Sequence, residues 1–392
     1  MHHYQQFGSY FGQTAGGMEH LAVDELLELG ASEATAGKRG VTFKANQTTL
    51  YRVVYGSRLL TRVLATISTF PCHDTDYLYK KARQIDWREF IARGATFAIL
   101  HHTANSKIEH SQFAALRLKD AIVDQLRDAW GERPDIDRDN PDVWLQLAIH
   151  NNRATINFDC AGHSLSKRGY RVKSVEAPMQ ETLAAAIVRH SAWDGETPLH
   201  DPFCGSGTLL AEALMRYCRV PASFLHDTFG FMRLPDYNPA LWAKVKSQAD
   251  GAVRPLPPGL ISGSDIDQRA IEAARTNLRR LPGGENIALK QCDFRRLPPM
   301  QDSTILANPP YGLRLKSRDI EQLYRDFGAW LRQCGGAQGY VYSGDIELLK
   351  TMNLRPRWKK ELNNGGIDGH LFKMLVFGNK PKAESGERKE KS

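Results

Sequence analysis

The tetrapeptide Asn308-Pro309-Pro310-Tyr311 follows an apolar stretch at 303–307 and carries groups that can activate a weakly nucleophilic amine. The side-chain oxygen of Asn308 and the backbone carbonyl of Pro309 are two hydrogen-bond acceptors, and the fixed proline dihedrals keep them aimed. Together they can hold both hydrogens of a nucleobase amine and free the nitrogen lone pair to attack a methyl donor. Because asparagine takes up no proton at neutral pH, preorganised acceptors rather than a general base would do the catalysis.

Tyr311 offers a flat face on which a target base can stack once it is turned out of its helix or loop. The alternative interpretation of this segment is a rigid proline turn with an exposed tyrosine. We predict a catalytic loop for methylation of an exocyclic nucleobase amine. Its catalytic residues are Asn308, Pro309, Pro310 and Tyr311, and Asn308 is also expected beside the cofactor.

A second motif, residues 201–208, reads Asp-Pro-Phe-Cys-Gly-Ser-Gly-Thr and follows an expected strand at 197–201. Its two glycines let the backbone approach a ligand at the start of the next helix. The third glycine of a dinucleotide fingerprint is missing, because Leu210 stands there. A carboxylate at Asp201 would repel a pyrophosphate but suits a cationic sulfonium, so S-adenosylmethionine (SAM) fits better than NAD; a plain tight turn is the alternative. The predicted cofactor-binding residues of this motif are Asp201, Phe203, Gly205, Gly207 and Thr208.

Two further strands of the same region end in acidic residues. Asp265 is placed to accept hydrogen bonds from the ribose hydroxyls, with Ile266 packing on adenine. Asp267 could instead cap the helix that follows. Asp293 could accept from the adenine amino group, with Phe294 packing nearby. Three acidic residues at the ends of three successive strands of one sheet strengthen the prediction of a SAM site.

Other chemistries find less support in the same residues. The loop after 303–307 has no cysteine, which argues against methylation at carbon 5 of cytosine. Cys204 and Cys292 adjoin the expected cofactor and are interpreted as packing residues. The six cysteines lack the close spacing of a zinc or redox motif, and the pair His101-His102 has no matching ligands. No metal site is predicted.

These motifs need an open sheet to bring them together. Short apolar stretches at 197–201, 260–265, 287–294, 303–307 and 339–343 alternate with helical patterns, for example from Thr208 and over 268–280. This alternation predicts an α/β fold with a Rossmann-like, doubly wound and mostly parallel sheet. Ligands of such sheets bind at the carboxyl ends of the strands, which is where the motifs stand.

The N-terminal half has a different pattern, typical of two small α+β units. The first has a helix at 18–29, a strand at 41–45, and a helix and strand over 47–69. The second has a strand at 97–100, a helix at 111–130, and a hairpin of 143–149 with 154–159. The domain boundaries follow as 1–72, 73–162, a linker at 163–175, a catalytic domain at 176–379, and a charged, disordered tail at 380–392.

The predicted linker is polar, glycine-punctuated and locally basic. It is interpreted either as an RNA-backbone contact or as a solvated hinge with ordinary surface charges, and the sequence does not separate the two. The candidate RNA-binding residues are Lys167, Arg168, Arg171 and Lys173.

The overall charge and hydropathy of the 392 residues restrict the possible partners and location of the protein less strongly than the motifs restrict its chemistry. The 52 basic against 44 acidic residues give a net charge of +8 and a pI near 9.1, which is consistent with a polyanionic partner without requiring one. The start has neither a basic leader nor an apolar stretch, and no run is long enough to span a bilayer. A cytoplasmic location without a membrane partner is the default expectation.

The three motifs, together with residues 176–185 upstream, resemble the THUMP-containing large-subunit rRNA guanine methyltransferases of the RlmL type, from about Tyr10 to Phe377. The resemblance implies a ferredoxin-like N-terminal region, an RNA-binding THUMP domain over the second unit, and a SAM-dependent methyltransferase domain. It also implies 23S rRNA or a large-subunit assembly particle as partner, and the guanine 2-amino group as acceptor. The segment at 179–182, including Thr182, would then help to close over the methionine part of the cofactor. The longest family members continue into a second methyltransferase unit, so one of their two activities is expected here.

Three alternatives stay open at this point. An Asn-Pro-Pro-Tyr loop serves adenine amines equally well, so a DNA adenine-N6 methyltransferase is possible in principle, although an RNA-type N-terminal module disfavours it. A tRNA guanine methyltransferase would also use a THUMP domain. A non-catalytic RNA-binding assembly factor is the alternative from another class, against which the intact Asp201, Asp265 and Asn308 argue.

Overall fold

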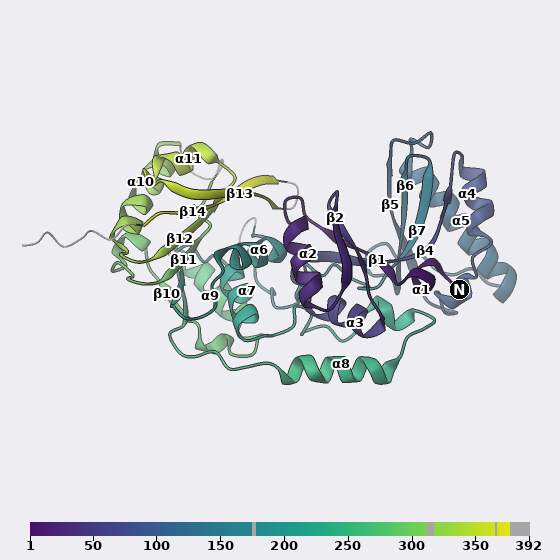
Figure 1. Ribbon diagram of the computed structural model, residues 1–392, viewed down its shortest axis with the longest axis horizontal. Helices are drawn as coiled ribbons and strands as arrows, with labels where there is room; N and C mark the ends of the chain where they lie inside the picture. Colours follow the sequence, from purple (N-terminus) through teal and green to yellow (C-terminus); the bar gives the residue numbers. More distant parts are fainter. Residues whose placement is uncertain (175–177, 312–316, 365–366, 377–392) are drawn as a thin grey trace, which may run out of the picture.

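Two seven-stranded sheets organise the chain, one built from residues before 160 and the other from residues after 198 (Figure 1). The computed structural model describes residues 1–174, 178–311, 317–364 and 367–376. The tail at 380–392, which we predicted to be disordered, lies outside these ranges. Within them, no helix combines the length and the apolar character needed to cross a membrane.

The N-terminal sheet has the strand order β2-β3-β1-β4-β7-β6-β5. The long strand β4 pairs with β1 through its first half and with β7 through its second half, both antiparallel. The two α+β units that we predicted as separate therefore share one continuous sheet, because twelve residues give β4 the length to serve both. The elements are α1 His3–Phe7, β1 Ser9–Thr14, α2 Glu19–Glu28, β2 Ser32–Gly37, β3 Gly40–Lys44, α3 Gln47–Gly56, β4 Leu60–Pro71, α4 Thr75–Ala82, β5 Phe97–Ala104, α5 Ser111–Trp130, β6 Val143–His150 and β7 Arg153–Asp159.

The predicted hairpin of the second unit is confirmed. Strands β6 and β7 pair antiparallel, with Ile149 opposite Ala154. Asn151 and Asn152 form the turn with φ of 50° and 56°, the left-handed conformation that a two-residue hairpin of this twist needs and that asparagine tolerates.

The catalytic sheet has the order β10-β9-β8-β11-β12-β14-β13. Its first five strands are parallel, whereas β14 runs antiparallel to both β12 and β13. The predicted fold class is confirmed, although the sequence analysis missed the β13–β14 hairpin. The elements are α6 Glu181–Ser191, β8 Leu199–Asp201, α7 Thr208–Tyr217, α8 Pro239–Gly251, β9 Ile261–Asp265, α9 Gln268–Leu278, β10 Ala288–Gln291, β11 Thr304–Ala307, α10 Ser317–Gln333, β12 Gln338–Ser343, α11 Ile346–Thr351, β13 Pro356–Asn364 and β14 Ile367–Met374.

Helices bury both faces of the central strands β11 and β12, which explains why these strands are almost entirely buried rather than alternating. On β11, Leu306 packs in the cluster that includes α6 and α7, while Ile305 and Ala307 pack in the cluster that includes α10 and α11. The polar residues that follow the central strands stand at the carboxyl ends of those strands, where the site forms.

The segment at 163–174 is packed between the two halves rather than being a solvated hinge. Leu165, Arg168 and Tyr170 are each 1% exposed. The Arg168 guanidinium donates to the buried Glu212 carboxylate of α7 at 3.1 Å, and it also donates to the backbone carbonyls of Leu165 and Arg58. A buried carboxylate needs such a partner to offset its desolvation. The predicted RNA contact of Arg168 is therefore wrong, whereas Lys167 and Lys173 are exposed and stay predictions.

Direct contacts fix the N-terminal half on the catalytic half. The Tyr55 hydroxyl donates to Asp250 of α8 at 2.7 Å, and the Arg58 guanidinium donates to the carbonyl of Met215 of α7 at 2.9 Å. Tyr55 also packs edge-on against Trp242 of α8, at 5.3 Å between ring centroids. The orientation of the first half toward the catalytic sheet is thus set by a buried, hydrogen-bonded interface.

Candidate active site

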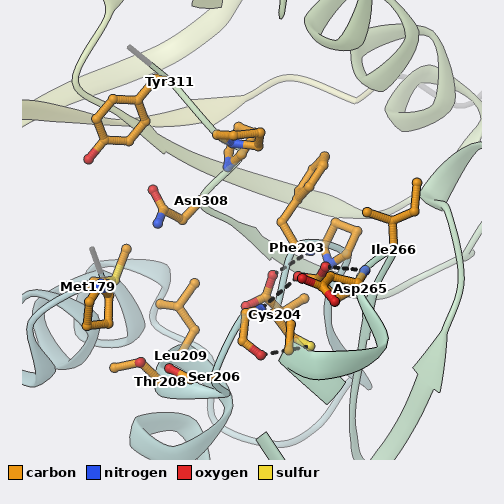
Figure 2. Close-up of a pocket in the computed structure, with 18 of the residues that line it drawn as sticks. Met179, Phe203, Cys204, Ser206, Thr208, Leu209, Asp265, Ile266, Asn308 and Tyr311 are labelled. Atoms are coloured by element: carbon orange, nitrogen blue, oxygen red, sulfur yellow. Dashed lines mark hydrogen bonds between the residues drawn. The ribbon is translucent and has the colours of Figure 1, made fainter. Parts of the chain in front are cut away.

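A cavity of about 1560 Å³ opens at the carboxyl ends of β8, β9, β11 and β12, where the three sequence motifs meet (Figure 2). That volume exceeds the 300–1,000 Å³ of an ordinary small-ligand pocket. It leaves room for a nucleobase beside a cofactor. From the predicted set, the lining includes Asp201, Phe203, Gly205, Thr208, Asp265, Ile266, Asp293, Phe294, Asn308, Pro309, Pro310 and Tyr311.

The floor of the cavity carries two buried carboxylates. Asp201 is 1% exposed and accepts from the Phe203 amide at 3.0 Å, and burial raises its pKa to about 8. Asp265 accepts from the amides of Gly205 at 2.9 Å and Asp267 at 3.0 Å; burial raises its pKa, and the backbone hydrogen bonds oppose that rise. The nearby charge of Asp265 raises the pKa of Asp201 further. A cationic ligand would relieve both effects.

The two glycines of the motif have different tasks. Gly205 lines the cavity with φ of 52°. Gly207 has φ of 85° and is not among the lining residues; a Cβ there would lie 3.2 Å from the Cβ of Ala274 on α9. Gly207 allows α7 to pack closely on α9, and its contact with the cofactor stays a prediction.

An aromatic and aliphatic wall stands on the β9 and β10 side. The Phe203 ring lies 5.2 Å from Phe294, which in turn packs on Phe327 of α10, so Phe294 belongs as much to the core as to the cavity. Ile266 is 66% exposed at the rim, where it presents apolar surface to a ligand (Figure 2). Asp293 accepts from the Arg295 amide at 2.9 Å and pairs with the Arg295 guanidinium at 2.9 Å, which leaves part of its carboxylate for a ligand.

The catalytic loop leaves β11 at Ala307 and faces the open part of the cavity. The Asn308 Oδ1 atom is buried and has no hydrogen-bond partner among the described residues. Figure 2 shows the Asn308 amide directed into the space between Tyr311 and Met179. The Tyr311 ring lies against Gly344 after β12, so closely that a Cβ on Gly344 would be 2.8 Å from Tyr311 Cε2. The next residue of the motif, Gly312, lies outside the described residues.

Arg171 was predicted to contact RNA, but the structure directs it inward. Its guanidinium donates to the Met179 carbonyl at 2.7 Å and to the Thr208 hydroxyl at 3.0 Å, and it pairs with Glu181 at 3.3 Å. It joins the segment before α6 to the first residue of α7. Nothing in the sequence distinguishes it from the exposed Lys167, because both lie in the same basic stretch.

The segment at 178–180 lines the cavity, whereas Thr182 does not. Thr182 is fully buried in the first turn of α6, and its Oγ1 atom has no hydrogen-bond partner among the described residues, so its contact with the cofactor stays a prediction. Residues 176–177 lie outside the described ranges. Further lining residues that the sequence did not indicate are Leu209, Asp345, Asn364, Asp368 and His370. The last three come from the β13–β14 hairpin, and a correct prediction of that hairpin would have been the signal for them.

The described residues of the cavity offer neither a reactive cysteine nor a group of metal ligands. Cys204 lines the cavity, but burial raises the pKa of its thiol well above the usual value and keeps it protonated. In the described part of the chain, no three His, Cys, Asp or Glu side chains are grouped to hold a metal ion. The arrangement instead combines carboxylates at a cofactor pocket with an unpaired acceptor at a substrate pocket.

Family models match three successive parts of the chain. Residues 9–64 match the RlmL ferredoxin-like domain, residues 72–159 match the THUMP domain, and residues 168–373 match the RMKL-like methyltransferase domain. The last range alone covers more than half of the 392 residues.

Whole-chain comparisons agree with these matches. The chain is 35% identical to a putative RNA methyltransferase of Synechocystis, over 94% of this chain and 97% of that protein. It is 36% identical to a ribosomal RNA large subunit methyltransferase K/L of Vibrio campbellii over 92% of this chain, and spans about half (52%) of that relative's length. A crystal structure of a putative methyltransferase complexed with SAH superposes with a TM-score of 0.84 at 27% identity, covering 96% of this chain and 99% of the other.

Proposed function

The chain belongs to the RMKL-like methyltransferase family with THUMP and RlmL ferredoxin-like domains, and from this premise we propose that it methylates the 2-amino group of a guanine in 23S rRNA, with SAM as donor. The family membership confirms the resemblance drawn from the sequence. The observation that most supports methylation of an amine is the buried Oδ1 atom of Asn308, which lies at the edge of the cavity without a hydrogen-bond partner among the described residues.

The residues of the cavity fit SAM. The buried Asp201 carboxylate and the Asp265 carboxylate favour a cation over a pyrophosphate, and Ile266 offers apolar surface for adenine. The match to a structure complexed with SAH supports a cofactor of this kind. When bound, SAM supplies an electrophilic methyl group on a sulfonium. We assign Asp265 to the ribose hydroxyls and Asp201 to the positively charged part of the cofactor.

Asn308 and Pro309 would act on the acceptor amine. A buried acceptor without a donor costs free energy of about 1–3 kcal/mol, which a substrate N–H recovers on binding. The Asn308 side-chain oxygen and the Pro309 carbonyl hold the two amine hydrogens, so that the nitrogen lone pair points away from the base plane. The lone pair would take the methyl group that bound SAM supplies, with SAH as the leaving group, and one amine proton would be released to water.

Tyr311 would hold the extruded base by stacking. Its ring is fixed against Gly344, which restricts where a base can lie relative to Asn308. Stacking of that kind is the usual means of retaining a flipped nucleotide.

The substrate class rests on the relatives. Proteins named as an RNA methyltransferase and as ribosomal RNA large subunit methyltransferases support rRNA, and the matched THUMP domain supports RNA in general. The guanine 2-amino group as acceptor and 23S rRNA as the particular molecule are details that we propose beyond the names of these relatives. With ribosomal RNA as the substrate, we also propose a cytoplasmic location for the reaction.

A substrate panel tests this proposal. The purified full chain is incubated with methyl-labelled SAM and, separately, with protein-free 23S rRNA, assembled large subunits, tRNA and DNA. We expect label in 23S rRNA or in the large-subunit particle. Label in tRNA alone would show that tRNA, and not rRNA, is the substrate. Label in DNA would show that the protein is a DNA methyltransferase. No label in any of the four would favour a non-catalytic binding role.

A further inference from the structure

Basic side chains gather on β13, the last strand of the catalytic sheet. β13 pairs with β14, and its other edge is the end of the sheet order. Four basic residues at and just before this strand are exposed, and we call them the β13 basic strip: Arg355, Arg357, Lys359 and Lys360.

The charges of the strip are not neutralised within the described structure. None of its four side chains has an ion pair with a described residue. The arginines of the THUMP region are different: Arg83 pairs with Asp128, and Arg117 pairs with Asp76. An unpaired cluster keeps its positive potential and can attract phosphates, whereas paired arginines contribute little field. The strip therefore carries positive charge that no described acidic side chain neutralises through an ion pair.

The strip leads to the active site. β13 ends at Asn364, which lines the cavity and whose Oδ1 atom accepts from the Gln180 amide at 3.1 Å. At about 3.4 Å per residue, Lys360 lies about 14 Å and Arg357 about 24 Å from that end. Successive phosphates of one strand advance about 3.4 Å along a helical axis, so the interval between Lys360 and Arg357 covers about three of them.

The N-terminal half extends this surface. Lys38 and Arg39 are exposed in the turn between β2 and β3, and the Arg39 carbonyl accepts from the Thr14 amide at 3.1 Å. The adjoining loop rests on β13: a Cβ on Gly17 would be 2.3 Å from the Glu361 carbonyl. Figure 1 shows β13 reaching from the catalytic sheet toward α2 and β2.

Lysines on an edge strand also discourage pairing between copies of a chain. That purpose would not require a strand that ends in the cavity. Glu361, the acidic residue of the strand, lies 3.9 Å from His370 and is 79% exposed, so one negative charge stands between Lys360 and the end of the strand at Asn364.

We propose that the β13 basic strip, continued by Lys38 and Arg39, binds the sugar-phosphate backbone of the RNA beside the target nucleotide and guides it to the cavity. This inference rests on the proposed function for the class of substrate. It assigns the backbone contact nearest the reaction to the catalytic sheet and the β2–β3 turn, outside the THUMP domain. The contact is electrostatic and independent of sequence.

The test compares a variant that lacks two positive charges of the strip with a control variant that lacks two positive charges on α9. The variant Lys359→Gln/Lys360→Gln is compared with Arg279→Gln/Arg280→Gln at the end of α9, also an adjacent, exposed pair without an ion pair among the described residues. Binding of the full chain to protein-free 23S rRNA is measured between 50 and 200 mM salt. Binding of SAH and the melting temperature of each variant report on the pocket and the fold.

Because Lys359 and Lys360 are neighbours on a strand and point to opposite faces of the sheet, we expect the strip variant to lose RNA affinity up to about tenfold at low salt and to reduce the salt slope by about one, for the lysine that faces the RNA. SAH affinity and melting temperature should stay at the wild-type values, and the α9 variant should resemble the wild type. Equal RNA affinity and salt slope in strip variant and wild type, while the wild type methylates RNA, would overturn the inference alone. Loss of binding to large subunits with an unchanged slope on protein-free RNA would point to a protein partner and also overturn it. Absence of methyl transfer by the wild type to any RNA would instead overturn the proposed function.

Discussion

The Asp265 carboxylate accepts a hydrogen bond from the Gly205 amide at 2.9 Å, which joins the loop after β8 to the end of β9. One carboxylate oxygen thereby holds the glycine turn in place, and the other accepts from the Asp267 amide. Both oxygens keep further lone pairs for a ligand. The cofactor pocket is thus shaped by the same residue that we assign to the ribose.

Replacing Asp265 by alanine should weaken SAM binding more than it lowers turnover at saturating SAM. Hydrogen bonds to a charged group contribute about 1.5–3 kcal/mol, so a rise in the SAM dissociation constant of about ten- to a hundredfold is expected. Asp267→Ala is the matched control, because Asp267 caps α9 and pairs with Arg269. Calorimetric titration measures both variants, and a larger loss for Asp267→Ala would reverse the assignment.

Replacing Asn308 by alanine should remove turnover and leave cofactor binding intact. Removing one preorganised hydrogen-bonding group typically costs about a hundred- to a thousandfold in kcat. Single-turnover assays on RNA, together with SAM titration, separate the two effects. If SAM affinity fell as far as in Asp265→Ala, Asn308 would be a cofactor ligand rather than a catalytic residue.

SAM affinity should rise with pH up to about pH 8. Burial raises the pKa of Asp201 to about 8, so below that pH the free protein holds this group protonated. Binding of a cation favours the ionised carboxylate and releases the proton, so affinity should increase up to tenfold per pH unit and level off above pH 8. Titrations from pH 6 to 9 test this, and the dependence should flatten in Asp201→Asn. The same profile in the variant would show that another group titrates.

Replacing Arg168 by methionine should destabilise the fold rather than weaken RNA binding. The Glu212 carboxylate would lose its 3.1 Å partner while fully buried, which typically costs about 3–5 kcal/mol. Denaturant unfolding should show this loss, and the double variant Arg168→Met/Glu212→Leu should recover much of it. Lys167→Met, on the exposed neighbour, serves as the control. Wild-type stability with reduced RNA affinity in Arg168→Met would restore the RNA-binding interpretation.

The catalytic sheet was predictable because both of its signals are local. Strands such as β11 are apolar throughout, and the residues that end them, Asp201, Asp265 and Asn308, are polar and stand at one edge by topology alone. The comparison with known families confirmed the resemblance that those residues carried.

Other features depend on contacts between residues far apart in the chain. The two arginines and two lysines of the segment at 167–173 are all basic and stand close together in the sequence. Arg168 and Arg171 point inward because they contact Glu212 and Thr208, which are distant in the sequence. Strand β4 joins two units into one sheet through pairings with strands on either side of it in the sequence. Hydropathy patterns contain neither kind of information.

The identity of the methylated atom tests the central claim most directly. Wild-type protein is supplied with SAM that carries a deuterated methyl group and with large-subunit RNA, and the digested nucleosides are separated and fragmented by mass spectrometry. The account predicts deuterated N2-methylguanosine, absent when Asn308→Ala replaces the wild type. A deuterated methyl group on adenine, or on a ring carbon or ribose of any nucleoside, would contradict it.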